Sequence, residues 1–197
     1  MLPLLFAFIF LIKALILFVL LPHFGDSLKP FYGMNLFADN YNLIAHNLAV
    51  GNGYRFYPST AETLFREPGY PLFLASTFLL FGYSLTAAKV TNFLLSIITA
   101  FIIVKIVKKV TSDPLVILGA PLLYLFHPAI IISESRGGYE ILLILFLCLL
   151  VIYIYRSINT DKIINYFVTG CILGIAVLIK STLLLFPIFL IAYLGLL

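Results

Sequence analysis

The sequence predicts an all-α integral membrane protein, a polytopic helix bundle with one long polar loop near its N-terminus. Hydrophobic residues make up 63% of the 197 residues and charged residues only 10%, whereas a soluble domain is roughly 25% charged. The mean hydropathy is +1.15. Apolar runs near the length of about 20 residues that crosses a bilayer recur along the chain. Together these observations exclude a soluble globular domain.

Six apolar runs are expected to form membrane spans. The first is interpreted as a retained span, because it lacks the basic start and small-residue cleavage site of a signal peptide. Lys13 interrupts this run, and we interpret its side chain as reaching toward a lipid headgroup or a protein cavity. The last run is still apolar at Leu197, so a truncated N-terminal module, which could be inactive alone, is expected. The runs lie near residues 2–22, 86–107, 114–132, 138–156, 163–180 and 183–197.

Basic residues predict how the chain is oriented in a plasma or inner membrane. Short connections rich in Lys and Arg stay cytoplasmic, and such residues cluster at 105–109 and 156–162. The N-terminus is then cytoplasmic, and the loop 23–69 is extracytoplasmic, as is the connection 131–140 with Glu134 and Glu140. This parity requires that residues 70–82 do not cross, because at about 1.5 Å per residue they are too short for a core of about 30 Å. We expect an interfacial helix there.

The polar loop is expected to contain a second short helix near 40–50, which ends before Gly51. Asp39 stands at the expected N-cap of this helix, where a carboxylate accepts backbone N–H bonds. It is also a candidate catalytic carboxylate. The spacing alone favours the cap, but the two interpretations are compatible. Tyr41 and His46 lie beside it, and a lone histidine here is more often a hydrogen-bonded interfacial residue than a base.

Three charged residues outside that helix are candidates for chemistry. Arg66 suits phosphate binding, because its guanidinium is permanently charged and presents a planar fork to anionic oxygens; the alternative is an interface anchor that pairs with Glu67 or with lipid. Glu140 heads an apolar run, which favours either a functional acid or a favourable charge in a first helical turn. Lys180 ends the fifth span, where it could add positive charge near a phosphate, although an interfacial anchor ranks slightly ahead.

Several kinds of function have no support in the sequence. Cys148 and Cys171 lie inside apolar runs, where a thiol behaves as a small hydrophobe. No His, Cys and acid residues cluster at ligand spacing, so a divalent metal, although possible, is unsupported. The net charge is +4, but the basic residues are dispersed at span ends, which gives no nucleic-acid footprint.

The motifs carry a resemblance to a known family. They are Asp39-Asn40-Tyr41, Gly51-Asn52-Gly53-Tyr54 and Arg66-Glu67-Pro68-Gly69-Tyr70-Pro71, followed by Glu140 opening a span and a glycine-containing span ending at Lys180. This order resembles the N-terminal part of GT-C glycosyltransferases, above all the dolichyl-phosphate-mannose protein mannosyltransferase and aminoarabinose transferase superfamily. Many aminoarabinose-transferase-like members instead carry Asp-Glu and Lys-Pro pairs, which weighs against a metal role and that sugar.

The resemblance implies a membrane enzyme of cell-envelope glycosylation that moves a sugar from a polyprenyl-phosphate donor to a hydroxyl of a lipid, glycan or protein acceptor, with inversion. Asp39 matches the family's general base, and Arg66, with Lys180, is expected to bind the donor phosphate. Glu67, Glu140 and Tyr41 are expected to support the site or contact substrate.

The alternative is a non-catalytic polytopic membrane protein, either a transporter or a lipid-handling subunit. Transporters tend to carry charges near mid-membrane and repeated halves. In this sequence the charges gather on one face and no internal repeat is evident, which favours the transferase.

Overall fold

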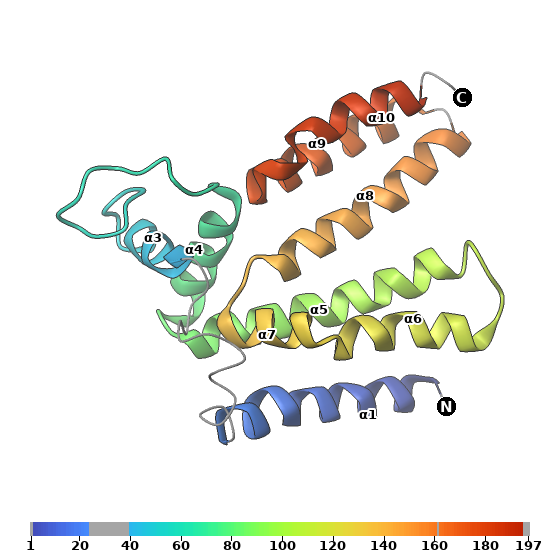
Figure 1. The fold of residues 1–197 in the computed structure, drawn as a ribbon, viewed down its shortest axis with the longest axis horizontal. Helices are drawn as coiled ribbons and strands as arrows, with labels where there is room; N and C mark the ends of the chain where they lie inside the picture. The colour runs from blue at the N-terminus through green and yellow to red at the C-terminus, as the bar shows by residue number, and fades with distance from the viewer. Residues whose placement is uncertain (1, 24–39, 161, 195–197) are drawn as a thin grey trace.

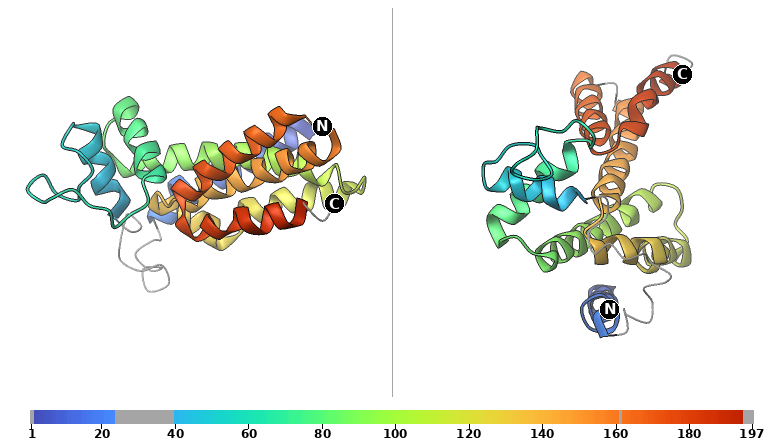
Figure 2. Two further views of the ribbon diagram at one scale, coloured as in Figure 1. Left: turned by 90° about the horizontal axis from the view of Figure 1, so that it is seen from above. Right: turned by 60° about the vertical axis from the view of Figure 1, so that its left-hand side comes forward.

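The computed structural model describes residues 2–23, 40–160 and 162–194, and within these ranges the regular structure is helical, without strands (Figure 1). The long helices run lengthwise through the molecule, and α3 and α4 gather at one end of it (Figures 1 and 2). The chain is thus an all-α bundle, as the sequence predicts. In chain order the elements are α1 (Leu2–Leu15), the π-helical η1 (Ile16–Leu20), α3 (Tyr41–Ala49), α4 (Gly69–Phe81), α5 (Leu85–Val107), α6 (Pro114–Phe126), α7 (Pro128–Arg136), α8 (Glu140–Thr160), α9 (Ile163–Ile179), the 3₁₀-helical η3 (Ser181–Leu185) and α10 (Phe186–Leu194).

Within the described ranges, three helical segments are long and apolar enough to cross a membrane: Phe6–His23, Leu85–Val107 and Glu140–Thr160. A fourth candidate is the pair α6 and α7, which bend by 46° at their junction. The sequence predicts one continuous run over 114–132, but the helix breaks at His127, whose backbone is extended (φ −62°, ψ 128°). Pro128 follows, and proline disfavours a helical conformation in the residue before it. Local backbone chemistry therefore divides this apolar run.

The ends of the helices fall into two groups. The α5–α6 turn, the end of α8 and the start of α9 lie at the same end of the molecule as the start of α1, opposite α3 and α4 (Figure 1). At that end Lys109 of the first turn lies over the ring of Tyr155 in α8, with Nζ 4.4 Å from the ring centroid. The basic connections are thus neighbours, as the predicted orientation requires. Which face is cytoplasmic remains a prediction.

Lys13 is buried inside the bundle rather than directed at lipid headgroups. Its side chain is 1% exposed, and Nζ lies 2.7 Å from Oε1 of Glu134, which is 0% exposed. Nζ also donates a hydrogen bond of 2.7 Å to Oγ of Ser96. Of the two environments that the sequence suggests for Lys13, the protein interior is therefore the one observed. Glu134, expected on the outer face, instead joins α7 to α1, with α5 alongside.

The start of α4 packs directly against the end of α9. A Cβ atom on Gly69 would lie 2.7 Å from the carbonyl carbon of Leu178 and 2.8 Å from the nitrogen of Ile179, closer than real Cβ atoms approach backbone. The next residue, Tyr70, is fully buried, and its hydroxyl donates a 2.6 Å hydrogen bond to the carbonyl of Gly137. A residue without a side chain at position 69 therefore fixes how closely the polar loop approaches α9.

We predict that Gly69→Ala destabilises the protein by about 1–3 kcal/mol, the usual result of forcing an extra group into a packed contact. Thermal unfolding in detergent, followed by circular dichroism, measures the change. Gly170→Ala in α9 is the matched control, because nothing lies within 4 Å of a Cβ there, and alanine is favoured over glycine in a helix by about 0.5–1 kcal/mol. Equal melting temperatures for the two variants would contradict the close-contact argument.

The buried ion pair generates a second prediction. Lys13→Met or Glu134→Met alone leaves an unpaired charge in a medium of low dielectric constant, so each is expected to destabilise the protein by about 3–5 kcal/mol. The double variant should lose less than either single variant, because it buries no charge. Lys162→Met, at an exposed position, is the control and should melt like the wild type. Additive losses in the double variant would refute the pairing.

Candidate functional site

The carboxylate of Glu67 joins the polar loop to the end of α9. Its Oε1 accepts hydrogen bonds from the hydroxyl (2.7 Å) and the backbone N–H (3.2 Å) of Ser181. Its Oε2 accepts a 3.0 Å hydrogen bond from the hydroxyl of Tyr41 in α3. Nζ of Lys180 lies 3.7 Å from Oε1. One side chain thus links the loop to α3 and to Ser181, which lies 114 positions later in the chain.

Glu67 is a fixed negative charge at neutral pH. Burial by itself would raise the pKa of this carboxyl, but hydrogen bonds from Ser181, from its own backbone and from Tyr41 lower the pKa to about 2. A carboxylate with so low a pKa is a weak base, and protein donors already contact both of its oxygens. Glu67 is therefore suited to holding Lys180 in place rather than to transferring protons.

The guanidinium of Arg66 lies between two aromatic rings. Its Cζ is 5.4 Å from the ring centroid of Tyr41 and 5.1 Å from that of Phe65. The hydroxyl of Tyr54 lies 2.9 Å and 3.1 Å from the carbonyl oxygens of Arg66 and Glu67, and it donates to this pair. Burial raises the pKa of Tyr54 to about 12, so the hydroxyl remains a donor at neutral pH. The backbone that carries the arginine is thereby held at two carbonyls.

Lys180 brings a second cation to the same region. Its Nζ lies 4.8 Å from the ring centroid of Tyr139. The centroid of that ring is 5.7 Å from the centroid of the Tyr41 ring, over which the Arg66 guanidinium lies. Glu67 contacts Lys180, and a second carboxylate, Glu62, lies 3.7 Å from Arg55, so the described charges here are three cations and two carboxylates. A pocket of about 470 Å³ lies beside them, lined by residues that include Tyr54, Glu62, Arg66, Glu67 and Ser181. The excess of one cation favours an anionic group in this region.

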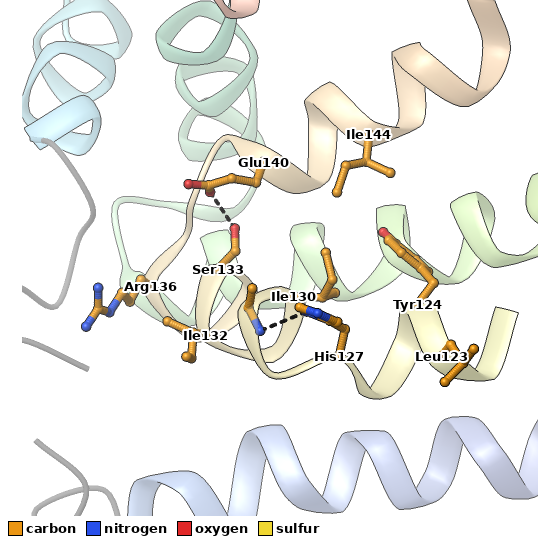
Figure 3. A pocket seen from close by; sticks show the side chains of 10 residues that line it. Leu123, Tyr124, His127, Ile130, Ile132, Ser133, Arg136, Glu140 and Ile144 are labelled. Carbon is orange, nitrogen blue, oxygen red and sulfur yellow. Dashed lines mark hydrogen bonds between the residues drawn. The ribbon is translucent and has the colours of Figure 1, made fainter. Parts of the chain in front are cut away.

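Glu140 lies in a different pocket from Arg66. Its Oε2 accepts a 2.6 Å hydrogen bond from Oγ of Ser133, and both residues line a cavity of about 660 Å³ between α6, α7 and α8 (Figure 3). A Cβ on Gly138 would collide with both of these side-chain oxygens. The carboxylate therefore depends on a glycine in the α7–α8 connection.

The structure brings together four of the residues singled out from the sequence, Arg66, Glu67, Lys180 and Tyr41, and it leaves Glu140 in the neighbouring pocket. Asp39 lies outside the described residues.

The expectation that Asp39 caps the helix near 40–50 is wrong. The N-cap of α3 is Asn40, whose φ of 60° is left-handed and whose side chain makes no capping hydrogen bond. Asparagine adopts this conformation more readily than most residues, since its short polar side chain can hydrogen-bond locally. The helix therefore begins one residue later than the sequence suggests.

Sequence reasoning missed Ser181, Tyr54 and Tyr139. Tyr54 ends a glycine-rich turn motif, and Tyr139 directly precedes Glu140, so both stood within recognised motifs. Ser181 had no signal, because its partner is far away in the chain. Across residues 2–23, 40–160 and 162–194, no three or more His, Cys, Asp or Glu side chains gather as a metal site would require.

The apolar helices and the charged site at one end of the bundle define an integral membrane protein with a polar site at the end of its spans. Residues 66–196, more than half of the chain, match the dolichyl-phosphate-mannose-protein mannosyltransferase family, and the chain belongs to this family. It is a membrane glycosyltransferase of a family that uses polyprenyl-phosphate sugar donors, so the resemblance to GT-C enzymes is confirmed. No curated protein and no solved structure gives a match. The matched segment begins at Arg66 and includes Glu67, Glu140 and Lys180.

The low pKa of Glu67 generates a pH-dependent prediction. This carboxyl titrates at about 2 when folded, against an ordinary value of 4.5, so its stabilising effect is complete above pH 4.5 and is lost as the pH falls toward 2. Glu67→Gln should therefore melt below the wild type at pH 7, and the gap should narrow from pH 4.5 downward. Glu62→Gln is the control, because Glu62 is 69% exposed and should show little gap at any pH. A gap for Glu67→Gln that does not change with pH would contradict the assignment.

Proposed function

We propose that this chain carries the donor site of a transferase that moves a sugar from a polyprenyl phosphate to an acceptor hydroxyl at the extracytoplasmic face of the membrane. The observation that carries this proposal is the convergence of Arg66 and Lys180, which Glu67 and two aromatic rings hold at one end of the bundle. The family of the chain supports the same reaction class.

The two cations suit a phosphate that becomes a leaving group. When the bond between the anomeric carbon and the phosphate oxygen breaks, negative charge on the phosphate increases, and a cation fixed beforehand stabilises that charge without reorganising. Arg66 offers a planar fork that can contact two phosphate oxygens, whereas Lys180 acts as a point charge. Glu67 is a positioning residue in this scheme, because its hydrogen bonds and ion pair fix Lys180 and the backbone beside Arg66.

The proposed transfer is a direct displacement. The acceptor oxygen forms a bond to the anomeric carbon, the bond from that carbon to the phosphate oxygen breaks, and the polyprenyl phosphate leaves with the electron pair. The acceptor proton passes to a general base, and the anomeric centre inverts. Glu67 is unsuited to that task because of its low pKa, so we assign the base to Asp39, which the resemblance places in the first loop.

Sugar transfer from radiolabelled polyprenyl-phosphate donors, in membranes that contain the full-length protein, tests this function. We expect Asp39→Asn to lower kcat by at least about 100-fold, the usual contribution of a positioned base, with little change in the donor KM. We expect Arg66→Ala to raise the donor KM at least about 10-fold, the effect of losing a charged hydrogen bond to an anion.

Arg156→Ala is the matched control for Arg66→Ala. Arg156 is exposed near the C-terminal end of α8, where its guanidinium Cζ lies 5.1 Å from the ring centroid of Tyr153. Its loss should leave the donor KM unchanged. Equal effects of the two arginine variants would remove the assigned phosphate site, and an absence of transfer from every donor would refute the enzyme as proposed.

A further inference from the structure

A buried amide in the apolar helix α5 reaches the connection between α7 and α8. Asn92 lies in α5 and is 1% exposed. Its Nδ2 donates a 2.9 Å hydrogen bond to the carbonyl of Gly138 and lies 3.5 Å from the hydroxyl of Tyr70. That hydroxyl in turn donates a 2.6 Å hydrogen bond to the carbonyl of Gly137. Two consecutive carbonyls of the connection are therefore held by side chains of α5 and α4.

The α7–α8 connection depends on such hydrogen bonds because two glycines form it. Gly137 follows α7 with a φ of 62°, in the left-handed region that glycine adopts without strain. The backbone N–H of Gly138 donates a 2.8 Å hydrogen bond back to the carbonyl of Ser133 in α7. Neither glycine has a side chain that could fix the path of the backbone by packing. The position of the next residue, Tyr139, is consequently set by the hydrogen bonds of the connection.

Tyr139 carries this placement to Lys180. Nζ of Lys180 lies 4.8 Å from the ring centroid of Tyr139, a distance at which an aromatic ring attracts a cation. The same Nζ lies 3.7 Å from Oε1 of Glu67, which is longer than the range of about 2.7–3.2 Å for an N–H···O hydrogen bond. The ion pair with Glu67 therefore does not by itself fix the direction of the ammonium group, and the ring supplies a second contact.

We propose that Asn92 is a positioning residue of the transferase, which sets Lys180 in place for the donor phosphate through Gly138 and Tyr139. The inference rests on the proposed function. An amide inside an apolar helix is costly to bury unless its N–H groups find partners, and here the partner is a carbonyl in the segment that leads to Tyr139. Leucine has a similar shape and would fill the same space, but it offers no donor to that carbonyl. Loss of the amide frees the connection and lets the Tyr139 ring move away from Lys180.

Binding of radiolabelled polyprenyl phosphate to purified full-length protein tests this role without requiring activity. We expect Asn92→Leu to raise the Kd at least about fivefold, within the range of couplings between residues of one contact network. Thr99→Val is the matched control, because Thr99 is 0% exposed in the same helix and its hydroxyl donates to the carbonyl of Leu95 within α5. It should leave the Kd unchanged. A lower melting temperature with an unchanged Kd in Asn92→Leu would reduce the amide to a structural role and overturn the proposal.

Tyr70→Phe keeps the proposal testable if Asn92→Leu does not fold. This variant keeps the ring and removes only the hydroxyl that holds Gly137. We expect it to raise the Kd for polyprenyl phosphate at least about twofold, the lower end of the same range of couplings. An unchanged Kd would overturn the proposal.

A double-mutant cycle tests whether Asn92 acts through Lys180. In a Lys180→Met background we expect Asn92→Leu to change the Kd by less than about twofold, because the group that it positions is gone. The same loss in both backgrounds would refute the route through Lys180. Binding that is weakened by Arg66→Ala and by Lys180→Met, but not by Asn92→Leu, overturns this inference alone. Binding that neither Arg66→Ala nor Lys180→Met affects removes the proposed donor site, and the positioning role fails with it.

Discussion

The carboxylate of Glu67 is the interaction on which the organisation of the site depends. It is held by Ser181 and Tyr41 and lies beside Lys180, so it fixes three segments that are distant in the sequence. It can reach α9 because Gly69 allows α4 to approach the backbone there. A carboxylate with several donors remains charged at neutral pH. Gly69 therefore sets how closely α4 approaches α9, and the charge of Glu67 holds Lys180. Both are needed to bring Lys180 near Arg66.

The membrane imposes a second constraint, which the pair of Lys13 and Glu134 satisfies. An isolated charge inside a bundle surrounded by lipid is costly, whereas a pair with an additional hydrogen-bonding partner is tolerated. The pair ties the first helix to α7, which also carries Ser133 of the cavity between α6, α7 and α8. The N-terminal span is thereby attached to the helix whose Ser133 donates a hydrogen bond to Glu140. The ion pair between Lys13 and Glu134 therefore connects the first span to the helix that leads into the α7–α8 connection.

Two described pockets differ in the charged groups that line them. One is lined by Arg66 and Glu67, and it offers a cation to the phosphate of the proposed donor. The other is lined mainly by apolar side chains, and there Glu140 is hydrogen-bonded to Ser133. A polyprenyl-phosphate donor is consistent with the family of the chain.

The sequence by itself determined the class of protein, because composition and the length of apolar runs reflect the solvent in which a chain folds. It also indicated the family through the Arg66–Pro71 segment, and it predicted short helices near 40–50 and 70–82, where α3 and α4 are found. It did not predict that Lys13 pairs with Glu134, that Ser181 holds Glu67, or that the run 114–132 is divided at Pro128. The division had a local cue in the proline, which the continuous apolar pattern concealed. The pairings had none: local patterns report burial and helix ends, whereas which charged group meets which is decided only when distant segments pack together.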